Sequence, residues 1–226
     1  MHEPEAADTG ARPLILVTND DGVHAPGLIA LARAMRDKGE VVVVAPDRER
    51  SAVGHALTMH RPLRLELLRD GVYALNGTPT DCVAIAVKRL LPRRPDLLVS
   101  GINRGGNLGH DITYSGTVSA AFEGTLLGIP SFAVSLDADR HPNYATAARV
   151  AGRVASYLLE TGLPEDTLLN VNVPNRAWES LAGIRLTHQG RRLYDGDIRE
   201  VLEPRGRTHY WIGGGRPMQS EEAEAD

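Results

Sequence analysis

The feature that most constrains the fold is a short apolar run, Leu14–Val17, followed closely by two adjacent carboxylates, Asp20 and Asp21. Four aliphatic residues in a row are too few for a helix and are typical of a strand buried on both faces. In a turn that ends at Gly22, both carboxylates can converge on one point, where their repulsion favours a cation between them. A polar turn with Asx hydrogen bonds is the alternative, and this segment alone does not decide between the two.

A helix and a second buried strand follow this first strand. Residues 26–36 begin with proline, carry apolar residues at helical spacing and precede Gly39, a typical stop signal. Val41–Pro46 is the second apolar run. Strand, helix and strand in this order predict a right-handed βαβ unit and therefore a parallel sheet.

The same alternation continues along the chain. Residues 63–67 and 71–77 are expected to form a hairpin. Buried strands are predicted over residues 95–100, 131–136 and 168–174, and helices over residues 78–91, 118–127 and 144–159. This repetition predicts an α/β protein with a doubly wound, mostly parallel, Rossmann-like sheet and helices on both faces.

The character of the chain changes after Pro174, where Arg, Gly and aromatic residues become frequent. Residues 198–203 and 208–212 predict a C-terminal β-hairpin arm that carries Tyr210 and Trp211. Docking of this arm on a neighbouring subunit is one interpretation, and packing on its own domain is the other. The expected parts are a disordered extension (1–12), an α/β catalytic core (13–182), a β-rich arm used in oligomerisation (183–215) and a flexible tail (216–226).

Composition excludes several classes of protein. The net charge of −4 gives no electrostatic case for a nucleic-acid polymer or an anionic membrane as the main partner. No segment approaches the roughly 20 apolar residues of a membrane span. The single cysteine, Cys82, excludes an internal disulfide framework and is expected in the core on a helix. A cytoplasmic location is the resulting expectation.

Polar residues gather directly after the predicted strands, at the edge where parallel sheets bind ligands. These residues are Asp20, Asp21, residues 47–51, residues 103–107, Asp137 and Asp139. Carboxylate, hydroxyl and carboxamide oxygens suit a hard ion such as Mg²⁺ or Mn²⁺. Zinc is disfavoured because the eight histidines lack metal-ligand spacing. His24, His55 and His110 lie on the same predicted rim, either as acid or base groups or as solvated loop residues.

A Gly/Asn-rich tract over residues 101–109 leads through Ser115, Gly116 and Thr117 into a predicted helix. Exposed backbone N–H groups and the helix dipole favour an anion there, so the tract is a candidate phosphate cradle. It has neither the Gly-Lys-Ser/Thr of a Walker loop nor a GxGxxG turn joining strand directly to helix. An ordinary capped helix after a flexible loop is the alternative.

Several motifs together resemble those of the SurE survival-protein family, in order and spacing, over residues 14–175. The matching segments are Val17–Gly22, Ala45–Pro46 with Glu49–Ser51, Asn76–Asp81, Ser100–Asn103 with Gly105, Asn107 and Gly109, Tyr114–Val118, and Glu123–Gly124. The combination is far more specific than any single motif.

The resemblance implies a 5'-nucleotidase, a metal-dependent phosphomonoesterase that hydrolyses nucleoside 5′- and 3′-monophosphates, with short-chain polyphosphate as a further substrate. It implies one divalent ion per subunit, Mg²⁺ or Mn²⁺, and a homodimer or tetramer. Asp20 and Asp21 are then catalytic, and the metal ligands are Asp20, Asp21, Ser51 and Asn103. The implied phosphate or substrate contacts are Asn19, Gly105, Asn107, Ser115, Gly116 and Thr117.

Two features depart from the family pattern. Ala52 stands where many relatives have Gly after the metal-binding serine. Relatives also continue past the aromatic hairpin into a further strand, so the sequence is expected to be incomplete at its end.

Two other functions remain as alternatives. A receiver-like phospho-acceptor module also places paired acids after a first strand, but it needs a Lys after the fifth strand, and none follows Leu136 there. A non-catalytic nucleotide sensor is the second alternative, and an assay of phosphate release with and without metal separates it. Water is the preferred nucleophile, although an adjacent Asp pair permits direct attack by a carboxylate.

Overall fold

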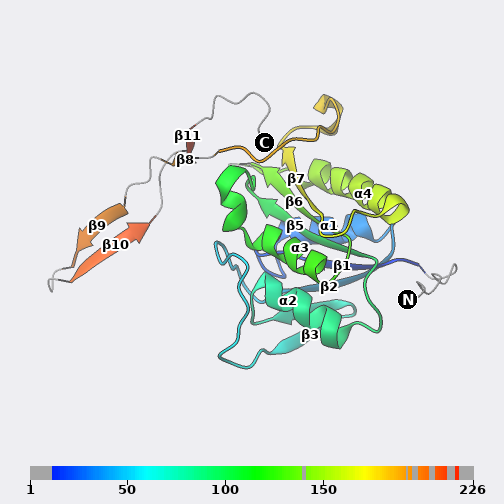
Figure 1. Ribbon diagram of the computed structural model, residues 1–226, viewed down its shortest axis with the longest axis horizontal. Helices are drawn as coiled ribbons and strands as arrows, with labels where there is room; N and C mark the ends of the chain where they lie inside the picture. The colour runs from blue at the N-terminus through cyan, green and yellow to red at the C-terminus, as the bar shows by residue number, and fades with distance from the viewer. Residues whose placement is uncertain are drawn as a thin grey trace. The chain divides into compact units, whose positions relative to one another are not determined.

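The computed structural model describes residues 12–138, 141–191, 193–194, 198–203, 207–212 and 217–218. The chain divides into two compact units, of which the larger comprises Met1–Asn107 with Thr113–Ala182 and the smaller Leu108–Ile112 with Gly183–Asp226. The larger unit is built on a seven-stranded sheet (Figure 1) with the order β3-β4-β2-β1-β5-β6-β7.

All neighbouring strands of this sheet run parallel except β3, which pairs antiparallel with β4. The strands are β1 Leu14–Thr18, β2 Glu40–Pro46, β3 Leu65–Arg69, β4 Val72–Leu75, β5 Leu97–Arg104, β6 Ser131–Asp137 and β7 Leu168–Pro174. The predicted doubly wound sheet and the predicted hairpin at its edge are therefore confirmed.

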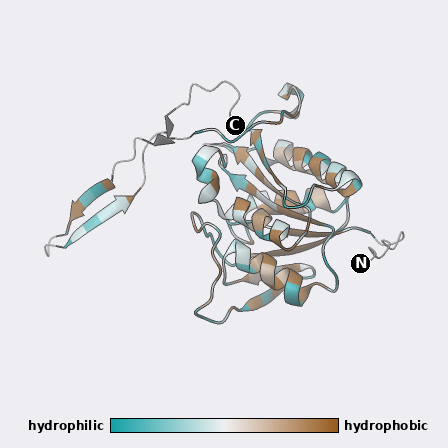
Figure 2. Ribbon diagram, in the orientation of Figure 1, coloured by the Kyte–Doolittle hydropathy of each residue, from teal (hydrophilic) through white to brown (hydrophobic). Residues whose placement is uncertain are grey.

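Four helices cover the two faces of the sheet (Figure 1). Along β1, Ile15 and Val17 join the core that includes α1 and α4, while the equally buried Leu14 and Leu16 point to the opposite face. All five residues of β1 are buried, and much of the ribbon of the sheet is brown, which marks hydrophobic residues (Figure 2). The helices are α1 Pro26–Met35, α2 Pro79–Ile85, α3 Gly116–Leu126 and α4 Tyr144–Thr161.

Two elements differ from their predicted form. The helix predicted over residues 78–91 is α2 followed by a π-helical turn, Ala86–Leu90. Strand β5 does not stop at Ser100 but continues to Arg104, because β6 extends alongside it as far as Leu136 and continues to pair with it past a bulge. The predicted core position of Cys82 is confirmed, since it is fully buried in α2.

The smaller unit contains the predicted hairpin, formed by β9 Ile198–Leu202 and β10 Thr208–Ile212 in antiparallel register. A second short pair, β8 Leu193–Tyr194 with β11 Pro217–Met218, was not predicted.

Short 3₁₀ turns occur at Gly109–Thr113 and Trp178–Ser180. Most of the predicted extension and most of the predicted tail lie outside the described residues. None of the helices in the described part of the chain is long and apolar enough to cross a membrane.

Candidate metal and phosphate site

The turn after β1 is closed by the side chain of Asn19. Its Nδ2 donates to the carbonyl oxygen of Gly22 at 3.0 Å, and its Oδ1 accepts from the Gly22 N–H at 3.2 Å. Gly22 has a φ of +100°, and a Cβ there would lie 3.0 Å from the carbonyl carbon of Arg48. Only glycine fits this turn without strain. The buried Asn19 holds the two ends of the turn together and so fixes the two carboxylates that lie between them.

Asp20 lies against the N-terminus of α3. Its Oδ1 accepts a hydrogen bond from the hydroxyl of Thr117, and the Thr117 backbone N–H donates to the same carboxylate. A Cβ on Gly116 would lie 2.8 Å from the Cβ of Asp20, so glycine is required for this close approach. Burial raises the pKa of Asp20, and the hydrogen bonds from Thr117 oppose that shift.

Asp21 points toward the end of β5. Its carboxylate accepts a hydrogen bond from the backbone N–H of Arg104 and lies near the phenol of Tyr144, in the first turn of α4. Burial, reinforced by the charge of Asp20, raises the pKa of Asp21 to about 6. The two carboxylates therefore repel each other, which is typical of sites where a cation binds between them.

The loop after β2 joins the same site. The backbone N–H of Arg50 donates to the carbonyl oxygen of Asp20 at 2.8 Å, which places Ser51 next to the acidic turn. Ser51 is exposed, and its hydroxyl donates to Oε1 of Glu49 at 2.6 Å. The charge of Glu49 raises the pKa of both Asp20 and Asp21, so a third carboxylate adds negative charge here. The sequence places Glu49 at this edge only as one of residues 47–51.

Asn103 completes the oxygen donors. Its Nδ2 donates to the carbonyl oxygen of Gly105 at 2.9 Å, which leaves Oδ1 without a hydrogen bond among the described residues. Its neighbour Arg104 bonds to Asp21, so Asn103 lies beside the acidic turn. In the described part of the chain no group of three His, Cys, Asp or Glu side chains is arranged to hold a metal. A cation here needs Ser and Asn oxygens as well as carboxylates, which suits a hard ion.

The candidate phosphate residues divide into two groups. In the first turn of α3, Ser115 caps the helix by accepting from the Val118 N–H at 3.1 Å, and Thr117 is engaged by Asp20. After β5, the Gly105 N–H donates to the carbonyl oxygen of Leu136 at 2.8 Å, and Asn107 is held by side chains of β6 and β7. The N-terminus of α3 thus binds the carboxylate of Asp20, a contact that the sequence did not predict.

A second buried carboxylate, Asp81, fastens the long loop that follows Ser51. Asp81 accepts from the N–H and the hydroxyl of Thr58, at 2.9 Å and 2.6 Å, and from the Thr78 N–H at 2.8 Å. Thr78 in turn caps α2. The motif Asn76–Asp81 therefore has a structural role, which is to hold the loop that leads away from the site.

The three candidate histidines have different surroundings. His55 contacts Oε2 of Glu123 at 2.9 Å and packs edge-on against Phe122, on the second turn of α3 beyond Thr117. His24 is exposed, and His110 belongs to the smaller unit. Asp137 ends β6 and is exposed, while Asp139 lies outside the described residues.

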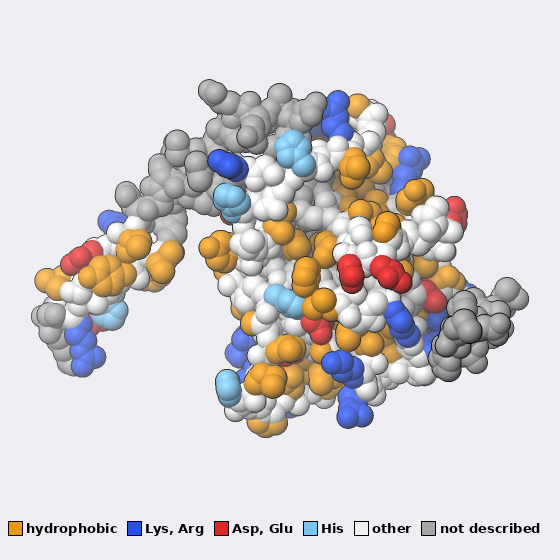
Figure 3. Space-filling view, in the orientation of Figure 1, with side chains coloured by type: hydrophobic (Ala, Val, Ile, Leu, Met, Phe, Trp, Pro, Cys, Tyr) orange, Lys and Arg blue, Asp and Glu red, His pale blue; other side chains and the backbone are white. Residues whose placement is uncertain are grey.

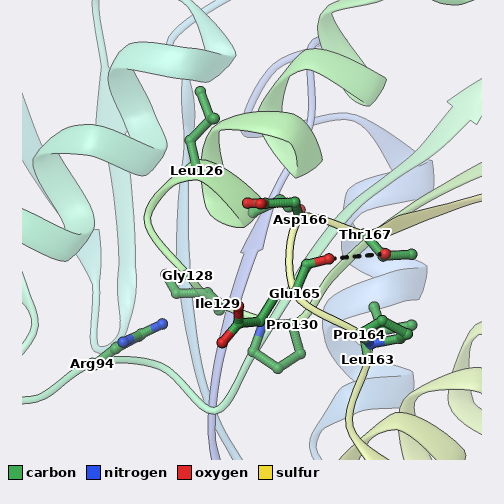
Figure 4. Close-up of a pocket in the computed structure, with 11 residues that line it drawn as sticks. Arg94, Leu126, Gly128, Ile129, Pro130, Leu163, Pro164, Glu165, Asp166 and Thr167 are labelled. Atoms are coloured by element: carbon green, nitrogen blue, oxygen red, sulfur yellow. Dashed lines mark hydrogen bonds between the residues drawn. The ribbon is translucent and has the colours of Figure 1, made fainter.

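A cavity of about 290 Å³ lies at the opposite edge of the sheet (Figure 4). It is lined by the C-terminal turn of α3, by Arg94 and by the segments that lead into β6 and β7, including Leu163–Thr167. Those strands begin here, whereas the acidic residues follow strand ends. The cavity is therefore separate from the candidate site.

The fold and the site together define a class of protein, a doubly wound α/β protein with an oxygen-rich, acidic site at the carboxyl edge of its sheet. Residues 15–196 match the family model described as Survival protein SurE, and the chain belongs to this family. It is 60% identical over 205 residues to the 5'-nucleotidase SurE of Geobacter sulfurreducens, and the aligned region covers 90% of this chain and 78% of that relative. The corresponding protein of Pelobacter propionicus is 59% identical over 202 residues, covering 89% and 82%.

A solved structure agrees with the fold. The SurE protein from Aquifex aeolicus superposes with a TM-score of 0.85 at 44% sequence identity, covering 95% of this chain and 87% of that one. The family resemblance inferred from the motifs is therefore confirmed.

Proposed function

We propose that this chain is a divalent-metal-dependent phosphomonoesterase that hydrolyses nucleoside 5′-monophosphates to nucleoside and phosphate. The observation that carries the proposal is the meeting of Asp20 and Asp21 with the first turn of α3 and the end of β5. The relatives named 5'-nucleotidase SurE support the same activity.

Asp20, Asp21, Ser51 and Asn103 are the proposed ligands of one ion per subunit, Mg²⁺ or Mn²⁺. Two carboxylates that repel each other, the hydroxyl of an exposed serine and a carboxamide oxygen that accepts no hydrogen bond among the described residues form a donor set that fits such an ion. When bound, a divalent ion supplies Lewis acidity that offsets negative charge on the phosphoryl oxygens.

The residues of the chain orient the reacting groups. Thr117 and the N-terminus of α3 hold Asp20, and Asn19 fixes the turn between the acids. The Gly116 N–H, the Ser115 hydroxyl and the loop from Gly105 to Asn107 are the proposed phosphate donors. Asp20 and Asp21 are the proposed catalytic residues, with water as the attacking group.

Further substrates, a cellular location and an oligomeric assembly are also proposed. Nucleoside 3′-monophosphates and short-chain polyphosphate are proposed as further substrates, and the cytoplasm as the place of action. The unit of function is proposed to be a homodimer or tetramer built through the arm over residues 183–215, with residues 13–182 as the catalytic core. No observation favours the receiver-like or sensor alternatives.

The test is phosphate release from nucleoside 5′- and 3′-monophosphates and short polyphosphate, after chelation and then with Mg²⁺ or Mn²⁺ restored. We expect hydrolysis only with metal. Asp21→Asn, purified identically, controls for contaminating phosphatases. Release no greater than that of the control for every substrate and metal would refute the proposal, and nucleotide binding without release would establish a sensor.

A further inference from the structure

Strand β7 carries two asparagines on one face. Its alternate residues Leu169, Val171 and Val173 pack into the core that includes α4, as expected for a strand at the margin of the sheet. Asn170 and Asn172 point to the opposite face, where an apolar side chain would normally be placed. Carboxamides there are unfavourable unless their hydrogen bonds are made, so their partners identify their role.

Both asparagines bond to one residue, Asn107. Oδ1 of Asn172 accepts from the backbone N–H of Asn107 at 2.9 Å, and its Nδ2 donates to the carbonyl oxygen of Asn107 at 3.1 Å. The side chain of Asn172 thus pairs with the backbone of Asn107 as a residue of a neighbouring strand would. Nδ2 of Asn170 donates to the same carbonyl oxygen at 2.8 Å.

The side chain of Asn107 is held as well. Its Nδ2 donates to Oγ of Ser135 on β6 at 2.7 Å, in a site where Asn107 is 7% exposed. One N–H of its carboxamide therefore remains for another acceptor. Backbone and side chain of Asn107 are both fixed by β6 and β7, four residues after the candidate metal ligand Asn103.

The carboxamide of Asn170 also indicates that this side chain holds Asn107. Its Oδ1 is buried and accepts no hydrogen bond in the part of the chain that the structure describes. An apolar residue would avoid this unsatisfied acceptor, so the carboxamide is explained by the bond that its Nδ2 makes to Asn107.

We propose that Asn170 and Asn172 are positioning residues, which hold Asn107 and the loop from Gly105 so that the remaining carboxamide N–H meets a substrate phosphate. This inference rests on the proposed function, because it assigns these asparagines to the phosphate half of that site. Within the part of the chain that the structure describes, their side-chain hydrogen bonds go to Asn107 and not to the proposed metal ligands, so their removal affects substrate binding more than the metal or the chemical step.

The first experiment compares Asn170→Leu and Asn172→Leu, which keep the side-chain size and remove the hydrogen bonds. We expect KM for a nucleoside monophosphate to rise about tenfold in each, with kcat and the metal concentration for half-maximal activity changing less than about threefold. Thr167→Val is the matched control, since it removes a side-chain hydrogen bond to the carbonyl oxygen of Glu165 before β7 begins. An unchanged KM in both asparagine variants would overturn the proposal.

The second experiment needs no activity and therefore separates this inference from the proposed function. Amide hydrogen exchange of Asn107 is measured in the protein without metal or substrate. Asn172→Leu should accelerate it at least about tenfold, because the acceptor of that N–H is lost, while Asn170→Leu should affect it less. Asn172→Ser is the second variant, should leucine prevent folding. Unchanged Asn107 exchange in the folded Asn172 variant would overturn the proposal even where the wild type hydrolyses nucleotides.

Discussion

The hydroxyl of Thr117 donates a hydrogen bond to Oδ1 of Asp20, which precedes it by 97 residues. This contact joins the first turn of α3 to the end of β1. It supports the ionised form of a carboxylate whose pKa burial would otherwise raise further. The helix N-terminus stabilises negative charge at the same place. The contacts with α3 therefore offset part of the cost of burying the Asp20 carboxylate.

Replacing either acid should abolish hydrolysis. We expect Asp20→Asn and Asp21→Asn to lose activity and bind metal more weakly while remaining folded, because both carboxylates follow the strand rather than pack in the core. Calorimetric metal titration and circular dichroism measure binding and folding separately. If both variants keep full activity, the metal interpretation is wrong.

The metal-free protein should lose stability as the pH rises through the range in which Asp21 ionises. Its pKa is about 6 in the folded protein against the ordinary aspartate value of 3.8, so the contribution of its protonation to stability is fully present below pH 3.8 and lost above pH 6. The shift corresponds to about 2 kcal/mol after allowance for partial exposure. In urea unfolding with chelator, the free energy of unfolding of Asp21→Asn should rise relative to that of the wild type by this amount as the pH increases between these two values. A difference independent of pH would contradict this prediction.

The fold was largely predictable because its signals are local. Apolar runs such as Leu14–Val17 and the Pro26 helix start depend only on neighbouring residues, and they gave the strands, helices and parallel order. The continuation of β5 to Arg104 was missed, because its extra pairing depends on the length of β6.

The site was predictable only in its list of oxygen donors. Topology predicts that Asp20, Asp21 and residues 47–51 and 103–107 lie at one edge of the sheet, whereas the choice of Ser51 and Asn103 as ligands comes from the family resemblance and stays a prediction. Backbone hydrogen bonds in the structure join these segments. The use of Thr117 by Asp20, and of two strand asparagines by Asn107, depends on contacts between segments far apart in sequence. No periodicity indicates such contacts.

Two helical glycines should respond oppositely to alanine. Gly116→Ala places a methyl group 2.8 Å from the Cβ of Asp20, so either the carboxylate or α3 must shift. We expect at least about a tenfold loss of kcat/KM and weaker metal binding. Gly152→Ala is the matched control, since its methyl group meets only Lys38 Cε at 3.9 Å, and it should raise stability by about 0.5–1 kcal/mol. Equal activity of the two variants would show that α3 does not restrict Asp20.

The neutral ligands should affect the metal requirement. Ser51→Ala and Asn103→Ala each remove one oxygen, and we expect the metal concentration for half-maximal activity to rise about three- to tenfold. Asn76→Ala removes a comparable carboxamide, whose Oδ1 accepts from the Arg64 N–H at 2.8 Å, and serves as a control for loss of a loop contact. Wild-type metal titrations in both ligand variants would make these residues structural.

The C-terminal hairpin should mediate assembly. Its large apolar side chains are exposed on both strands, including Ile198 at 65%, Trp211 at 68% and Ile212 at 87% (Figure 3). A two-stranded hairpin is marginally stable alone, and aromatic residues commonly anchor interfaces. We therefore expect a homodimer or a dimer of dimers at micromolar concentration, and deletion of residues 198–212 should give monomers with impaired activity. Light scattering measures both proteins, with Trp211→Ser as a milder variant that weakens the association. A full-length monomer, or a deletion variant that stays dimeric, would show that the hairpin does not hold the subunits together.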